Sequence, residues 1–160
     1  MTNKTSKKPT AKKKAEVSEK PKGFALSDLT SLTDESGVRM PIKNPVNPSE
    51  DLTNTSGDVM AIWVVGMDTQ TYKSAMAEFL KQFNITSKED LFSGDDTMEK
   101  LSKMSYVMAR CSVKWENIEI ERGKIEEYDV ERAEEIYTKH PFILMQLEGY
   151  VHKRANFLKK

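Results

Sequence analysis

The side chains that could carry out chemistry are two histidines and a single cysteine. His152 follows Glu148 by four residues, so both would share one helix face, a spacing that could hold a metal ion. A zinc site needs a third protein ligand, and no Cys or other His stands near this pair in the sequence. We therefore interpret Glu148 and His152 as a solvated pair on a helix surface.

His140 and Cys111 have structural interpretations as well. His140 precedes Pro141 and would end a helix, where the helix dipole favours an imidazolium. Cys111 lies between Met108 and Trp115 at helical spacing, which favours burial as a small hydrophobic residue over a role as a nucleophile. Because it is the only cysteine in the sequence, it excludes an internal disulfide and fits a reducing cytosol.

Two further patterns point away from catalysis. Gly66 follows an apolar segment and precedes an amphipathic one, but a single glycine there predicts a turn and not a phosphate-binding loop. The carboxylates at positions 119–127 alternate with apolar residues, which is typical of a solvated edge. We therefore expect a protein that is not an enzyme and that uses no cofactor or metal ion.

Charge separates the first 22 residues from the rest of the chain. The 160 residues include 25 basic and 25 acidic side chains, but residues 1–22 hold eight lysines and two glutamates. This arm is therefore net +6, and the remainder is net −6. Lysines without arginines or aromatic residues could bind phosphates non-specifically. Because the acidic body opposes that use, we favour a solubilising tail, or an intramolecular clamp on the acidic hairpin, over nucleic-acid binding.

Composition divides the chain into three parts. Residues 1–22 are rich in Lys, Thr, Ser and Pro and predict a disordered arm. Residues 23–58 predict a linker, with a short amphipathic segment followed by an extended, proline-containing stretch. Residues 59–160 predict the folded domain. The longest apolar run, residues 59–65, is too short to span a membrane, and the amino terminus lacks a secretory signal.

Hydrophobic periodicity predicts the elements of the folded domain. Residues 59–65 are β-branched and aromatic and predict a buried strand. The period switches to two at residues 118–125, which predicts a hairpin. Apolar side chains three and four residues apart predict four helices. These helices span residues 69–83, 97–115, 130–140 and 141–158, with Asp68, Asp96 and Asp129 as the caps of the first three and Pro141 in the first turn of the last. We therefore expect a mainly α fold: a small helical domain with a minor β element, namely one strand plus a short hairpin.

The methionines indicate a surface for another protein. The sequence has nine methionines, and Met98, Met104 and Met108 would share one helix. A methionine stripe is usually core, but methionine also lines grooves that accept varied apolar partners. A domain of about one hundred residues buries its own apolar stripes only in part. The candidate partner-binding residues are Met98, Met104, Met108, Trp115, Phe142, Met145 and Tyr150. The competing interpretation places them in the core, and we favour it for Trp115 and Met104.

Five short motifs follow one another within residues 59–160. In chain order they are Gly66-Met67-Asp68-Thr69 after the strand, Trp115-Glu116-Asn117-Ile118, Gly123-Lys124, Ala133 with Tyr137 ahead of Pro141, and Asn156-Phe157-Leu158. Their order and spacing resemble those of the tail assembly chaperones of long-tailed bacteriophages. The resemblance does not extend to residues 1–58.

The resemblance implies an α-helical protein made in the host cell cytoplasm and absent from the mature virion. Such chaperones bind the tape measure protein, keep it soluble and recruit tail tube protein subunits that polymerise around it. The partners implied are therefore the tape measure protein and the tail tube protein, without a membrane, and the oligomeric state stays open. Two alternatives remain: a structural virion subunit such as a connector or tail-completion protein, and a nucleic-acid-associated protein that uses the basic arm.

Overall fold

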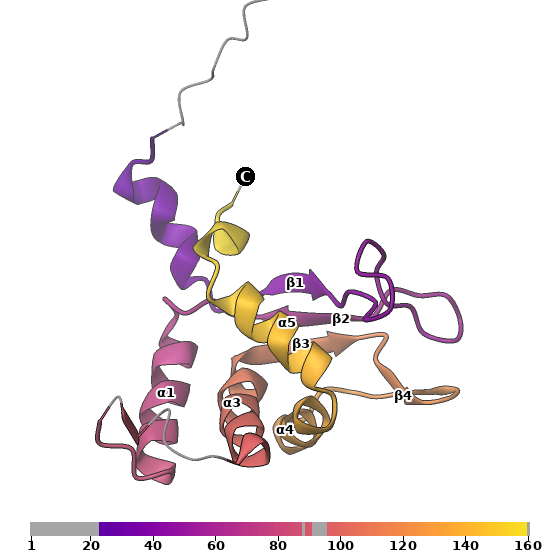
Figure 1. Ribbon diagram of the computed structural model, residues 1–160. Coiled ribbons are helices and arrows are strands. Elements are labelled where there is room, and N and C mark those ends of the chain that lie inside the picture. Colours follow the sequence, from indigo (N-terminus) through magenta and orange to yellow (C-terminus); the bar gives the residue numbers. More distant parts are fainter. Residues whose placement is uncertain (1–22, 88, 91–95, 160) are drawn as a thin grey trace, which may run out of the picture.

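The computed structural model describes residues 23–87, 89–90 and 96–159 (Figure 1). The expected disordered arm, residues 1–22, lies outside the described residues. The described elements, in chain order, are η1 (Leu26–Thr33), β1 (Val38–Pro41), β2 (Ala61–Val64), α1 (Gln70–Gln82), α3 (Thr97–Cys111), β3 (Ser112–Glu116), β4 (Glu119–Glu121), β5 (Lys124–Ile125), α4 (Val130–Lys139), α5 (Pro141–Val151) and η2 (Arg154–Phe157).

The expectation of a mainly α fold with one strand plus a hairpin is wrong, because the fold is mixed α/β. Strands β1, β2 and β3 form an antiparallel sheet in that spatial order, and β4 pairs with β5 in a separate two-stranded sheet. Helices α1, α3 and α4 stand side by side next to the three-stranded sheet, with α3 in the middle (Figure 1).

Strand β1 lies in the stretch that was expected to be an extended linker. Prolines favoured that interpretation, but Pro41 occupies a position where a missing N–H does no harm. The Ile42 amide donates to the Met60 carbonyl at 3.0 Å, so the odd-numbered residues of β1 point their backbone groups away from β2. Ile42 itself is fully buried. Part of residues 23–58 is therefore packed into the domain.

Strand β3 replaces the last turn of the helix that was expected to run to residue 115. The spacing of Met108, Cys111 and Trp115 continues the helical period, but α3 ends at Cys111 and the next residue begins β3. Trp115 then lies opposite Ile62 in β2. Pairing with a strand about fifty residues earlier in the chain overrides a local period, as tertiary contacts often do.

Two side chains of α5 bond to the free edge of β1 and of the segment that follows it. The Gln146 side chain accepts from the Lys43 amide at 2.7 Å and donates to the Lys43 carbonyl at 3.0 Å. One turn later, the Tyr150 hydroxyl donates to the Arg39 carbonyl at 3.3 Å. These side chains satisfy backbone groups that another strand would otherwise pair with, so α5 protects this edge from association.

Local signals set most helix boundaries as the sequence predicted. Asp129 caps α4 by accepting from the Arg132 amide at 2.9 Å, and Pro141 occupies the first turn of α5. At α1 the cap is Thr69, not Asp68, because the Thr69 hydroxyl accepts from the Tyr72 amide at 3.2 Å. Asp68 instead accepts from Arg154 at 2.7 Å, and that guanidinium lowers the pKa of the Asp68 carboxyl.

The short segment at the start of the described chain docks on the domain. Helix η1 lies beside η2 (Figure 1). The Lys159 amide donates to the Ser31 hydroxyl at 3.1 Å, and the Lys159 ammonium lies 3.1 Å from Asp34. The side chains of Phe24 and Leu26 nevertheless remain 65% and 87% exposed.

Candidate partner-binding groove

An apolar groove of about 350 Å³ lies where α1, α3 and the end of α5 meet. Its apolar lining comes from Met76 and Phe79 in α1 and from Met104, Val107 and Met108 in α3, and Tyr72, Lys100, Lys103, Glu148 and His152 complete it. Met76 and Met104 are only partly buried, so the groove opens to solvent along its thioether side chains. It is the kind of concave apolar surface that accepts a nonpolar ligand.

The helical period places these side chains in two facing rows. Tyr72 and Met76 are four residues apart on α1, and Met104 and Met108 are four apart on α3, so each pair lies along one helix face. Helices α1 and α3 run in opposite directions (Figure 1). Tyr72, near the start of α1, contacts His152 beyond the end of α5, whereas Phe83 just after α1 contacts Tyr106 and Lys103 in α3.

The two ends of the groove carry different polar groups. At the end near the start of α3 stand Lys100 and Lys103, and the Lys103 ammonium lies 2.7 Å from Glu99 and 5.9 Å from the Phe83 ring centroid. At the other end stand Glu148 and His152. The groove therefore passes from a lysine end to a glutamate end over an apolar floor.

The imidazole of His152 is held by two hydrogen bonds at the glutamate end. Its Nδ1 lies 2.9 Å from the Glu148 carbonyl oxygen, and its Nε2 lies 3.0 Å from the Tyr72 hydroxyl. Because a carbonyl oxygen only accepts, Nδ1 donates to Glu148, and the two contacts fix the orientation of the ring. Burial raises the pKa of the Tyr72 hydroxyl, with smaller contributions from Cys111 and Glu148. Tyr72 therefore remains a neutral hydrogen-bond donor there.

Two of the seven candidate partner-binding residues lie in the groove. Met104 and Met108 line it together, with Met108 only 3% exposed and Met104 partly buried. Met98 stands in the first turn of the same helix, 58% exposed and outside the groove lining. Met145 on α5 is 57% exposed and is also outside the lining.

The three aromatic candidates have other contacts. Trp115 donates from Nε1 to the Tyr137 hydroxyl at 2.9 Å. Tyr150 bonds to β1, as described above, and its ring meets the Phe157 ring edge-on at 5.8 Å between centroids. Phe142 is partly buried, with its ring 6.1 Å from that of His140. The structure therefore does not gather the seven residues into one surface.

Sequence reasoning did not assign the α1 side of the groove. Met76 and Phe79 belong to a helical stripe that the sequence shows clearly, but the same stripe is expected of any helix that packs on a core. What it could not show is which helix lies opposite. Lys100 stands four residues, or one helical turn, before Met104. That spacing is the signal in the sequence that could have assigned Lys100 to the groove.

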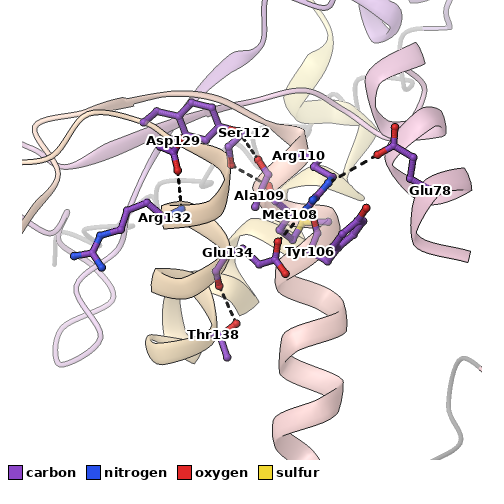
Figure 2. Close-up of polar contacts among 11 residues, drawn as sticks. Glu78, Tyr106, Met108, Ala109, Arg110, Ser112, Asp129, Arg132, Glu134 and Thr138 are labelled. Atoms are coloured by element: carbon purple, nitrogen blue, oxygen red, sulfur yellow. Dashed lines mark hydrogen bonds and ion pairs between the residues drawn. The ribbon is translucent and has the colours of Figure 1, made fainter. Parts of the chain in front are cut away.

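Polar contacts close the flank of α3 that faces α4, and Arg110 also reaches α1 through Glu78, 3.9 Å away (Figure 2). The Arg110 guanidinium lies 3.3 Å from the Tyr106 ring centroid, donates to the Tyr106 carbonyl at 2.9 Å and donates to Glu134 at 3.1 Å. Tyr137 of α4 is fully buried, and its hydroxyl lies 2.9 Å from the Ser112 hydroxyl. These contacts join α4 to α3 and to the start of β3.

Other potential chemistry lies outside the groove or in the core. Cys111 is fully buried, and burial raises the pKa of its thiol to about 12, so the thiolate is suppressed at neutral pH. Within the described ranges, no group of three or more His, Cys, Asp or Glu side chains is placed to hold a metal ion. No helix in the described part of the chain is long and apolar enough to cross a membrane.

Comparison of the chain with protein families, curated proteins and solved structures gives no match. The function is therefore inferred from the geometry of the groove and from the order of the sequence motifs.

Proposed function

We propose that this protein is a tail assembly chaperone that binds the tape measure protein of a long-tailed bacteriophage. The observation that carries the proposal is the open groove between α1 and α3, to which Met76, Met104 and Met108 contribute their side chains. The order of the motifs in residues 59–160 supports the same family.

The groove has the properties that such a chaperone needs. A tape measure protein is a long amphipathic helix, and its exposed apolar stripes promote aggregation until the tail tube encloses them. A protein that protects it must accept many different segments. Methionine side chains are unbranched and polarizable, so they repack around varied apolar partners. Weak binding at each segment suffices, because contacts repeated along one long partner reinforce one another.

The proposed function is confined to one compartment and to one stage of tail assembly. It acts in the host cytoplasm before the tail is complete, recruits tail tube subunits to the coated tape measure protein and leaves before the virion matures. A structural virion subunit would remain in the particle. Mass spectrometry of purified virions separates these two functions, and the protein in stoichiometric amount there would contradict the proposal.

Co-expression with the tape measure protein of the same phage tests the binding function. We expect the wild-type protein to raise the soluble yield of the tape measure protein, and the double variant Met76→Gln with Met104→Gln to lose most of that effect. Glutamine keeps the length and helix propensity of methionine but places a polar amide in the groove. An equal yield with and without the wild-type protein would count against the proposal.

Met98→Gln is the matched control. It makes the same chemical change on the same helix at a side chain that is 58% exposed and outside the groove lining. We expect this variant to raise the soluble yield as the wild type does. Thermal unfolding of each purified variant shows whether any loss of function reflects loss of the fold.

A further inference from the structure

The charged residues at the two ends of the groove indicate which charges a bound segment carries. Lys100, Met104 and Met108 follow one another at intervals of four along α3. At a rise of about 1.5 Å per residue, the row from Lys100 to Met108 is about 12 Å long. A helix lying along it would place about two turns in the groove, with apolar side chains at intervals of three and four.

At the lysine end, Lys100 is the cation without an ion pair among the described residues. Lys100 is exposed and Lys103 lies one turn further along α3, although Lys103 is paired with Glu99. The amino terminus of α3 also lies there and is capped by the Asp96 carboxylate. Lys100 therefore retains attraction for an acidic side chain on a bound helix.

The opposite end carries the carboxylate of Glu148. Glu148 lines the groove beside the ring of His152. Its negative charge makes a small contribution to the raised pKa of the Tyr72 hydroxyl. Neither Lys100 nor Glu148 has an ion-pair partner among the residues that the structure describes. Both charges are therefore available to a bound segment, and they have opposite signs at opposite ends of one apolar floor.

We propose that the groove selects helical segments in which an acidic residue stands at one end of the apolar stripe and a basic residue at the other. Lys100 contacts the acidic residue and Glu148 the basic one. The inference rests on the proposed function and names the chemistry of the tape measure segments that bind. A separation of about eight positions in the segment spans the roughly 12 Å of the row from Lys100 to Met108.

A double-mutant cycle with labelled peptides tests the inference. The parent peptide is a synthetic helix of about thirty residues with a central apolar stripe that is flanked by Glu and Arg eight positions apart. The flanking charges lie at least two turns from either peptide end, so helix fraying does not confound them. Affinity is measured by fluorescence anisotropy at low salt, because salt screens exposed ion pairs.

We expect Lys100→Glu to weaken binding of the parent peptide about fivefold, as loss of an exposed ion pair and gain of a like-charge contact would do. Exchanging the flanking Glu of the peptide for Lys should restore affinity to the Lys100→Glu variant and weaken it for the wild type. Glu148→Lys should show the same reciprocity with the flanking Arg. Lys81→Glu, the same change at an exposed α1 lysine outside the groove lining, should leave both affinities unchanged.

Three other outcomes would contradict the inference, and one of them would contradict the proposed function as well. If Lys100→Glu changes affinity no more than Lys81→Glu does, or if the peptide flanks have no effect, the charge-selection inference is wrong while groove binding stands. If no peptide binds the wild type whatever its flanks, the proposed function fails as well. Sedimentation showing a dimer that Met104→Gln dissociates would assign the groove to a second copy of this chain and would overturn the inference.

Discussion

Helix α3 has one flank against α4 and the other against α1, and the two flanks are packed in different ways. Toward α4, buried Tyr137 forms directional hydrogen bonds of 2.9 Å with Ser112 and Trp115 of β3, just beyond the carboxyl end of α3. Toward α1, Met76 and Met104 leave a groove of about 350 Å³ between two apolar rows. Hydrogen bonds at fixed geometry define a single arrangement, whereas thioethers without directional partners allow several. The first flank stabilises the fold, and the second leaves a surface that can adapt.

The largest effect is expected at the closed flank. Tyr137→Ala should lower the free energy of unfolding by about 3–5 kcal/mol, because it removes a large buried ring and leaves a cavity. Tyr137→Phe should cost about 1–3 kcal/mol, because the Ser112 hydroxyl and the Trp115 indole lose a buried partner. Urea denaturation measures both. A loss below about 0.5 kcal/mol for Tyr137→Phe would show that the hydroxyl contacts do not stabilise this flank.

Alkaline pH should weaken the folded state through Cys111, at the end of α3 where the closed flank begins. Burial raises the pKa of its thiol to about 12, above the ordinary value of 9.0. A raised folded-state pKa contributes stability that is complete below pH 9 and is lost as pH rises toward 12. The loss is at most about 1.4 kcal/mol per pH unit for one group. Urea denaturation at pH 8 and pH 10 should therefore show a smaller decrease for Cys111→Ala than for the wild type, and an identical decrease would contradict this assignment.

The smallest effect on stability is expected in the groove. Met76→Leu with Met104→Leu conserves volume and apolarity, so the free energy of unfolding should change by less than about 1.5 kcal/mol. Binding should nevertheless become more selective, since branched side chains repack less freely than thioethers. Anisotropy with a set of helical peptides that differ only in their apolar residues would show a wider spread of affinities. An unchanged spread would mean that the adaptability of the groove does not come from its methionines.

Signals that act within a few residues predicted much of the local structure. Asp96 and Asp129 cap α3 and α4, Pro141 begins α5, and Gly123 has the positive φ of 79° that the β4–β5 turn requires. The hairpin itself was predicted from the switch of the apolar period to two. Each of these features depends on hydrogen bonds or steric limits between near neighbours, so the sequence shows them directly.

Signals between near neighbours did not predict the three-stranded sheet or the α1 side of the groove. Val38–Pro41 looked like linker, and Ser112–Glu116 looked like the end of a helix, until both paired with β2. Their strand character depends on Ala61–Val64, which lies far from both in the chain. The helical spacing of Met104 and Met108 was visible in the sequence, but their position opposite Met76 was not.

The sequence by itself determined where most helices begin, which faces of them are apolar and how charge is distributed along the chain. The tertiary structure alone decided which apolar faces meet and which stay open. Periodicity and capping are local properties, but burial depends on contacts between residues far apart in the chain. Tyr137 of α4 hydrogen-bonds to β3 just beyond α3, whereas Met76 of α1 and Met104 are only partly buried and leave a groove between their helices.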